Sequence, residues 1–201
     1  MMDGLIQNHS FSPALSSQST ITDTGWDGYT ANNNWSLVFV INFPSTLTPQ
    51  TKFIEGNTSE LDVLLKIDSL SQMMFRWTGH KWNAYVNSTI LNSSAMAGKT
   101  VHFALVYDAT NYNALSSSTA VDVGNTTSQA NADLKFYYKV PADSVEWTLP
   151  ALSYSEDSWT VSDGKLGGIP SGIKYGPNQS NGGTMSNIQM WNVGLTTSTL
   201  P

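Results

Sequence analysis

The chain has 201 residues, a formal net charge of −6 and only 12% charged side chains. This length is enough for one hydrophobic core, and 40% hydrophobic with 11% aromatic residues can fill it, which argues against a disordered chain. The acidic balance argues against nucleic acid and anionic membrane surfaces as partners, because both attract basic proteins. Cys is absent, which weakly favours a prokaryotic or viral source over a secreted eukaryotic one.

The first 20 residues are polar and rich in Ser, without hydrophobic periodicity. We expect an N-terminal arm over 1–20 and one domain over 21–201. The start of the chain has neither the basic segment nor the apolar run of a signal peptide, so we expect no cleaved leader. Because free termini are usually poorly ordered unless something holds them, the arm is expected to lie along its own domain or against a partner.

From residue 35 onward, apolar and polar residues alternate with a period of two, which is typical of half-buried strands. In each strand we expect the apolar set on the core face and the polar set outside. Helix is limited to a turn or two, near 93–97 or after Leu195. The fold class is therefore all-β, a two-sheet antiparallel sandwich. The pattern predicts strands over 35–43, 51–56, 61–67, 73–77, 81–88, 100–108, 134–140 and 186–193.

Gly-rich turns are predicted over 77–82, 97–100, 162–168 and 180–183. A long polar stretch, 108–132, interrupts the strand pattern. Loops of that length without structure are uncommon in compact domains, so this one is expected to be functional or partly ordered.

Three stretches carry a resemblance to a known group of folds: "AGKTVHFALVYD" at 97–108, "LKFYYKV" at 134–140 and "GGTMSNIQMWNVGL" at 182–195. Their order, after a strand that opens on Trp35, resembles the concanavalin A-like and laminin G-like jelly-roll domains. The resemblance spans about residues 33–200. It implies a concanavalin A-like jelly roll, with two antiparallel sheets packed face to face about 10 Å apart.

Two carboxylates, Glu60 and Asp62, are expected on one face of the strand "ELDVLLKI". Glucanases of the same broad fold carry a strand of the form E-[IL]-D-x-E, whose outer two Glu do the chemistry. Here the third acid is replaced by Leu64, which can neither donate nor accept a proton. With Leu61, Val63, Leu65 and Ile67 on the core face, the acids and Leu64 are expected to face outward beside Lys66. We therefore predict no catalytic residue and no enzymatic activity.

Aromatic residues are the strongest indication of ligand binding, since their faces stack on the apolar faces of sugars. Around the "TGHK" turn and the long loop, the candidate glycan-binding residues are Trp77, His80, Trp82, Tyr112 and Asn125. Trp77 also continues the apolar alternation of its strand, so a core position is the alternative. No cofactor is required by the sequence. A rim Ca²⁺ held by Asp108 and Asp122 is the one candidate metal site, because related lectins bind calcium there through oxygen ligands.

Low charge, abundant Ser, Thr and Asn, the missing Cys and a polar arm together favour a virion structural protein. By resemblance, it would be a bacteriophage capsid-decoration or fibre-type surface protein. We expect its arm to contact other virion proteins and its sandwich to contact host-surface glycans at the virion surface, where an oligomer is compatible with this role. The alternative is an extracellular carbohydrate-binding lectin module exported by a bacterium. A glucanase-like glycosidase is the third and least favoured hypothesis.

Overall fold

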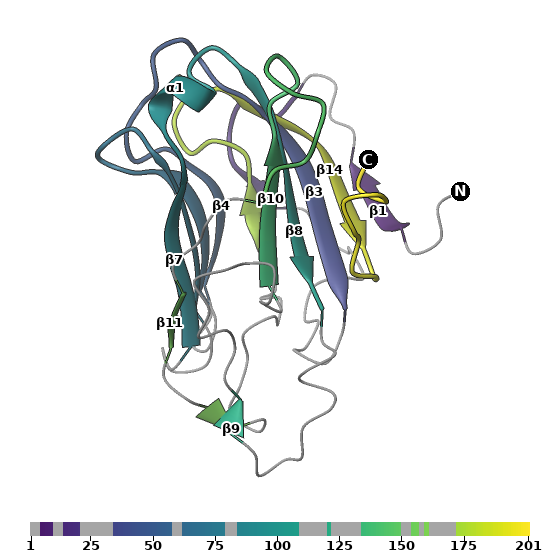
Figure 1. Cartoon of the computed structure of the whole chain (residues 1–201). Coiled ribbons are helices and arrows are strands. Elements are labelled where there is room, and N and C mark those ends of the chain that lie inside the picture. The colour runs from purple at the N-terminus through teal and green to yellow at the C-terminus, as the bar shows by residue number, and fades with distance from the viewer. Residues whose placement is uncertain are drawn as a thin grey trace.

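The described residues fold almost entirely into β-structure, arranged as two facing sheets (Figure 1). This arrangement confirms the predicted all-β, two-sheet antiparallel sandwich. The computed structural model describes residues 5–9, 14–20, 34–57, 62–78, 84–108, 120–121, 134–149, 154–156, 159–160 and 172–201.

One sheet has five strands, which are neighbours in space but far apart in sequence. All its pairs are antiparallel, and β3 and β8 pair along their whole length, from Trp35 opposite Tyr107 to Asn42 opposite Thr100. In spatial order the strands are β1 (Leu5–His9), β14 (Thr184–Trp191), β3 (Trp35–Asn42), β8 (Thr100–Tyr107) and β10 (Leu134–Lys139).

The other sheet has seven strands, and its central four are consecutive along the chain. A separate two-stranded pair joins β9 (Ala120–Val121) to β12 (Trp159–Thr160). The one described helix, α1 (Ser93–Met96), is capped by the Asn92 side chain, which accepts from the Ala95 N–H, and it confirms the predicted turn near 93–97. In order, the seven strands are β11 (Tyr154–Glu156), β7 (Ala84–Leu91), β6 (Met73–Thr78), β5 (Asp62–Ile67), β4 (Lys52–Asn57), β13 (Lys174–Tyr175) and β2 (Ser19–Thr20).

Parts of the polar N-terminal segment lie along the sandwich itself. The strand β1 pairs with β14 at the edge of the five-stranded sheet, and β2 pairs with β13 at the edge of the seven-stranded sheet. Between them, Leu15 and Met185 exchange two backbone hydrogen bonds of 2.8 and 2.9 Å. The described part of this segment therefore takes the first of the two expected arrangements, along its own domain.

The main core fills the space between the sheets with alternate residues of each strand. Aromatic rings join the two layers: Phe75 of β6 lies 5.0 Å from Phe136 of β10, measured between ring centroids, and Phe136 lies 5.6 Å from Phe103 of β8. All three side chains are fully buried. The predicted inward sets are thus confirmed for the described core strands, in which burial of large apolar groups supplies most of the stabilisation.

The outer face of the five-stranded sheet departs from the predicted alternation. In β3 the outward residues Ser36, Val38 and Val40 are also buried, as are Ala104 and Val106 of the neighbouring β8. The expectation of half-buried strands is therefore wrong for this part of the sheet. The physical reason is a second layer of chain that covers the face.

A bulge sets the side-chain phase of β14. Ser186 lies opposite Val40 and Gln189 opposite Val38, so two residues of β14 face the single Phe39 of β3. One of these two, Asn187, has φ of 51°, a left-handed value that Asn tolerates better than most residues. The extra residue keeps Met185 before the bulge and Ile188 after it buried in the core.

The predicted turn over 180–183 is confirmed and requires its last glycine. Gly183 has φ of +101°, and a side chain there would overlap the carbonyl oxygen of Asn42. This close approach lets β14 begin directly beside the end of β3.

Candidate ligand-binding site

The C-terminal segment 193–201 crosses the outer face of the five-stranded sheet and closes a second hydrophobic cluster on it. Leu195 and Leu200 of this segment pack over the sheet residues Val38, Ala104 and Trp191. Each of these five residues is less than 10% exposed. The segment therefore acts as a cover for an apolar sheet face that would otherwise meet water.

The hydroxyl of Ser36 links the C-terminal segment to the sheet through two hydrogen bonds. The Oγ of Ser36 donates to the carbonyl of Val193 at 2.7 Å and accepts from the N–H of Leu195 at 2.9 Å. Farther along, Thr196 and Thr199 close a tight turn, in which the Thr199 hydroxyl accepts from the Thr196 N–H at 2.7 Å. These bonds satisfy backbone groups that the irregular segment cannot pair within a sheet.

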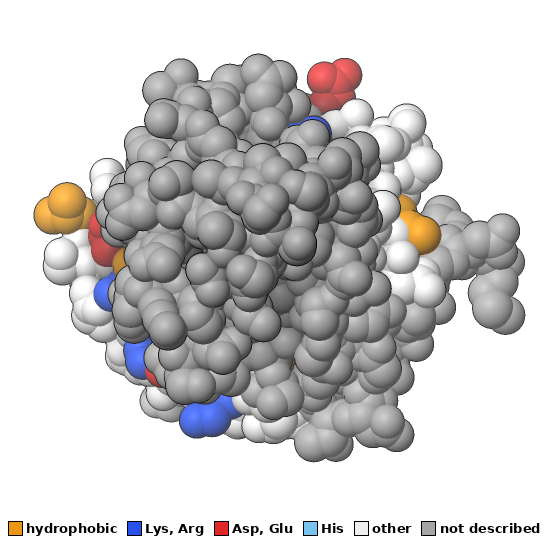
Figure 2. Space-filling model, turned by 90° about the horizontal axis from the view of Figure 1, so that it is seen from below, with side chains coloured by type: hydrophobic (Ala, Val, Ile, Leu, Met, Phe, Trp, Pro, Cys, Tyr) orange, Lys and Arg blue, Asp and Glu red, His pale blue; other side chains and the backbone are white. Residues whose placement is uncertain are grey.

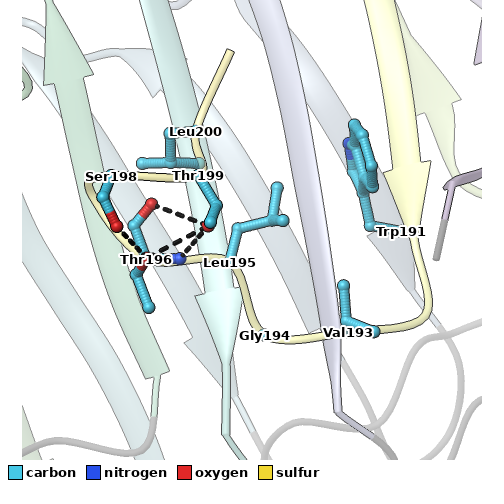
Figure 3. Close-up of a pocket in the computed structure, with 8 residues that line it drawn as sticks. All are labelled: Trp191, Val193, Gly194, Leu195, Thr196, Ser198, Thr199 and Leu200. Atoms are coloured by element: carbon cyan, nitrogen blue, oxygen red, sulfur yellow. Dashed lines mark hydrogen bonds between the residues drawn. The ribbon is translucent and has the colours of Figure 1, made fainter. Parts of the chain in front are cut away.

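Between the C-terminal segment and the sheet lies a partly open cavity of about 510 Å³, which we name the clasp pocket (Figure 3). Its volume falls within the range of about 300–1,000 Å³ that is typical of small-molecule sites. None of its described lining residues carries a charge. They are Trp191, Val193, Gly194, Leu195, Thr196, Ser198, Thr199 and Leu200.

The clasp pocket combines apolar and hydroxyl groups. Leu195 and Leu200 supply apolar surface, whereas Thr196, Ser198 and Thr199 present hydroxyls that bond to one another at 2.9 and 3.1 Å (Figure 3). A hydroxyl can donate and accept at once, so these groups retain capacity for a ligand. The arrangement can bind a neutral molecule that has both apolar and hydroxyl faces.

Two polar atoms on the outer face of β14 are buried without a hydrogen-bond partner among the described residues. They are the indole Nε1 of Trp191, a donor, and the Oε1 of Gln189, an acceptor. Trp191 is only 2% exposed. In Figure 3 the ring nitrogen lies on the side of the indole toward Leu195. Buried polar groups are nearly always paired in native proteins, with protein groups or with ordered water. Gln189 does not line the clasp pocket.

A smaller cavity of about 150 Å³ lies beside Gln189 and is also lined by His102 and Pro201. Burial lowers the pKa of His102 below its ordinary value, and the positive charge of Lys139 acts in the same direction. Lys139 also donates to the carbonyl of Pro201 at 3.2 Å. The end of the C-terminal segment is thus held beside the strand pair that carries His102 and Lys139.

Asp108, one of the two predicted calcium ligands, lies directly after β8 and is exposed. It lines a cavity of about 230 Å³ together with Lys135 and Tyr137, whose phenol pKa is raised by burial. The second predicted ligand, Asp122, lies outside the described residues. Within the described segments no three His, Asp or Glu side chains come together as a metal site.

The predicted glycan-binding residues fall mostly outside the described part of the chain. His80, Trp82, Tyr112 and Asn125 all lie there. The backbone of Trp77 lies in β6, opposite Val63 of β5 and Val86 of β7, as the strand predicted over 73–77 implies.

The predicted acid pair lies at the start of β5. Asp62 pairs with Asn57 and Thr78 through the backbone, and Glu60 is outside the described residues. Leu64, which was expected on the outward face of β5, is not part of the main core cluster, yet its side chain is only 6% exposed. The position that corresponds to the third acid is therefore a buried aliphatic side chain, which suits packing and not proton transfer.

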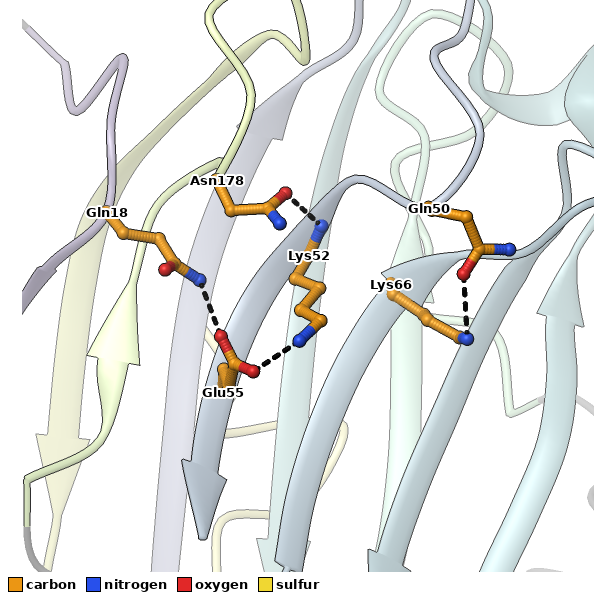
Figure 4. Close-up of polar contacts among 6 residues, drawn as sticks. All are labelled: Gln18, Gln50, Lys52, Glu55, Lys66 and Asn178. Atoms are coloured by element: carbon orange, nitrogen blue, oxygen red, sulfur yellow. Dashed lines mark hydrogen bonds and ion pairs between the residues drawn. The ribbon is translucent and has the colours of Figure 1, made fainter.

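The outer face of the seven-stranded sheet carries polar side chains (Figure 4). Glu55 accepts from the ammonium of Lys52 and from the Gln18 amide at 3.4 Å, and Lys66 donates to Gln50 at 3.1 Å. The hydrogen bond from Lys52 lowers the pKa of Glu55, although burial opposes it. Seen from the end opposite α1, acidic and basic side chains of the described surface both lie along its margin (Figure 2). Among the described residues, these contacts form a partly solvated polar surface.

Sequence reasoning did not select Trp191 or Gln189 as site residues. It assigned the stretch "SNIQMWNV" to a strand with Ile188 and Met190 inward, which the structure confirms. The signal that could have found the site is the same alternation: Gln189 and Trp191 then face outward together, and a large aromatic residue on an outward position requires a cover.

No family model and no curated protein matches the sequence. Solved structures are similar at low identity. Domain 4 of a GH43 extracellular arabinanase from Geobacillus stearothermophilus, in complex with arabinotriose, is 12% identical over 98% of this chain and 96% of that chain, with a TM-score of 0.44. A heptameric SAP-like pentraxin from Limulus polyphemus is 11% identical over 96% and 77%, with a TM-score of 0.40.

A third similar structure is a Trypanosoma rangeli sialidase in complex with 2,3-difluorosialic acid. It is 16% identical over 84% of this chain, with a TM-score of 0.43, and the match spans only 22% of the sialidase. In the described segments, no helix has the length and hydrophobicity needed to cross a bilayer.

Proposed function

We propose that this protein is a non-enzymatic β-sandwich that binds neutral glycans in the clasp pocket. The observation that carries the proposal is the composition of that pocket. Trp191, Leu195 and Leu200 form apolar walls, and the hydroxyls of Thr196 and Ser198 lie at the same opening. Sugars present the matching combination of apolar C–H faces and hydroxyl groups.

Charge narrows the class of glycan. The described lining of the clasp pocket has no cation that could pair with a carboxylate or a sulfate. The chain as a whole is acidic, with a formal net charge of −6. A sialylated or sulfated glycan would meet repulsion without a compensating ion pair, so a neutral glycan fits best.

The residues of β5 support the non-enzymatic part of the proposal. A retaining glycosidase needs two carboxyl groups about 5–5.5 Å apart. In the strand that resembles the glucanase motif, the residue in place of the second catalytic acid is Leu64, and it is buried. The predicted consequence is that the protein releases no reducing sugar from a β-glucan, and that Glu60→Gln leaves glycan binding unchanged.

The experiment that tests the proposal is a glycan array with the purified protein, with and without Ca²⁺, followed by calorimetric titration of the best ligand. We expect neutral glycans to bind. Trp191→Phe should weaken binding, whereas Trp147→Phe should not, because Trp147 packs on the same sheet face but does not line the clasp pocket. Binding that survives in Trp191→Phe and depends on Ca²⁺ would instead place the site at the rim near Asp108.

The wider setting of the domain is also proposed. Composition favours display on a virion surface, as a capsid-decoration or fibre-type protein, and the alternative is an extracellular lectin module. The strand order and the sequence stretches named above favour a sandwich of the concanavalin A-like type. Immunogold labelling of intact particles would test the virion assignment, since an antibody against an exposed surface protein must label the particle exterior.

A further inference from the structure

The cavity beside Asp108 adjoins the clasp pocket. It has a volume of about 230 Å³, and we name it the polar cavity. Gly194, Leu195 and Thr196 line both spaces, so this short stretch of the C-terminal segment forms a wall that they share. Crossing one extended chain takes about 10 Å, twice the spacing between neighbouring strands. A ligand that enters both spaces must therefore be longer than one sugar ring.

The polar cavity supplies the charged groups that the described lining of the clasp pocket lacks. Asp108 lies directly after β8, and Lys135 lies in β10, opposite Val106 of β8. Both line the polar cavity, together with the buried side chain of Tyr137. The carboxylate accepts hydrogen bonds, the ammonium donates them, and the phenol does both. A carboxylate accepts about four hydrogen bonds, so Asp108 can bind a hydroxyl in addition to its contacts within the fold.

We infer that the clasp pocket and the polar cavity together bind one neutral oligosaccharide, which crosses the C-terminal segment at 194–196; this inference rests on the proposed function. One sugar lies in the clasp pocket, against Leu195 and Leu200. A sugar farther along the same oligosaccharide donates a hydroxyl to Asp108 and accepts from Lys135. The exposed residue Thr196 lines both spaces and lies on the path between them.

The balance of charge in the polar cavity fits a hydroxyl-rich ligand better than an ionised one. A carboxylate or sulfate on the sugar would be attracted by Lys135 and repelled by Asp108, so the two effects oppose each other. A hydroxyl donates to one group and accepts from the other. Because hydrogen bonds to charged groups are stronger than those between neutral groups, the farther sugar should add measurably to the affinity.

The closing experiment compares glucose with maltotriose and cellotriose by calorimetric titration of the full chain, in EDTA to remove calcium. We expect at least one trisaccharide to bind about tenfold more tightly than glucose, as one added hydrogen bond to a charged group predicts. Asp108→Ala and Lys135→Ala should each reduce this gain. Lys66→Ala, on the outer face of the other sheet, should leave it intact.

Two neighbouring exposed residues allow the cavities to be blocked one at a time. Among the described lining residues, Thr197 belongs to the polar cavity alone and Ser198 to the clasp pocket alone. Both are exposed, so a larger side chain at either position should leave the fold intact. Thr197→Leu should remove the gain from glucose to trisaccharide, whereas Ser198→Leu should weaken the binding of all these sugars.

A spectroscopic readout on the unmodified chain does not depend on how well a variant folds. The trisaccharide that binds more tightly should shift the amide resonances of both Ser198 and Lys135. Preservation of the full gain in Asp108→Ala, Lys135→Ala and Thr197→Leu would place the farther sugar elsewhere and overturn the inference.

The remaining outcomes separate the inference from the proposed function. Equal affinity for glucose and both trisaccharides would overturn the inference and leave the neutral-glycan proposal in place. Binding of none of these sugars would also overturn the inference, and the wider glycan array would then decide the proposed function on its own.

Discussion

The outer faces of the two sheets differ in what covers them. On the seven-stranded sheet, Lys52 pairs with Glu55, and Lys66 donates to the Gln50 amide on the exposed surface. On the five-stranded sheet, Val38 and Trp191 lie under a second layer made by the C-terminal segment. An antiparallel sheet is stable with one wet face, so the covered face calls for a reason beyond folding.

The comparison shows that the C-terminal segment both covers the five-stranded sheet and forms the candidate site. Because the C-terminal segment is irregular, it packs less tightly against the sheet than a paired strand or a helix would. The remaining space is the clasp pocket, walled by Leu195, Leu200 and Trp191. On the outer face of the seven-stranded sheet, described polar side chains pair along the surface: Lys52 with Glu55, and Lys66 with Gln50.

The largest expected effect comes from removing the aromatic residue under the cover. Trp191→Ala should lower the free energy of unfolding by about 3–5 kcal/mol, because a large buried ring leaves a cavity. Urea titration followed by circular dichroism measures this change. Lys66→Ala on the open face should stay within about 0.5 kcal/mol. Equal losses for the two variants would contradict the distinction between the faces.

A smaller loss is expected from detaching the cover while leaving its apolar residues in place. Ser36→Ala removes the hydroxyl that bonds to Val193 and Leu195 and leaves both buried backbone groups unpaired. The expected cost is about 1–3 kcal/mol, with faster amide hydrogen exchange at Leu195. Ser69→Ala in the exposed turn after β5 serves as the matched control. Unchanged exchange at Leu195 would show that apolar packing alone holds the segment.

Lowering the pH should destabilise the covered outer face of the five-stranded sheet before it destabilises the outer face of the seven-stranded sheet. The folded-state pKa of His102 is lowered by burial and by Lys139, so its contribution is present above the unfolded pKa of about 6.5 and is lost as pH falls through the folded pKa. Thermal unfolding between pH 7 and 5 should therefore show a decline that His102→Gln flattens. A decline of the same size in His102→Gln would assign it to other groups.

The smallest effect is expected on the open face. Glu55→Gln removes the partner of Lys52 and should cost no more than about 1 kcal/mol at pH 7, since the pair is partly solvated. Because the pKa of Glu55 is lowered in the fold, its contribution exists above its unfolded pKa and disappears as pH falls through the folded pKa. The two proteins should thus converge at acid pH, and divergence there would contradict this assignment.

The sequence predicted the long strands because period-two alternation is a local signal. The strand predicted over 100–108 is observed as Thr100–Tyr107, and the one over 134–140 as Leu134–Lys139. It could not predict β2 or β13, because two residues contain no periodicity and their pairing depends on distant segments. The strand predicted over 81–88 is described from Ala84 and continues to Leu91, and its predicted first three residues lie outside the described part of the chain.

The candidate site was less accessible to sequence reasoning than the fold. Leu64 was expected on the outward face of β5, and the alternation that predicts this face does not show that the side chain is buried there. The same limit hid Trp191, whose cover comes from residues that follow it and have no strand pattern of their own. Alternation predicts which residues of a strand lie on the same face, but it does not predict that another segment of the chain covers that face.

The bulge in β14 has a consequence for the changes in length that this strand tolerates. Two residues of β14 lie opposite the single Phe39, so the bulge absorbs one residue of the sequence. In a regular strand of the same sequence, the phase set by Met185 would carry Gln189 and Trp191 inward and turn Ile188 and Met190 outward. Deletion of Asn187 therefore leaves the side chains that follow on their present faces, whereas a one-residue insertion that no bulge absorbs would exchange the core positions and the floor of the pocket.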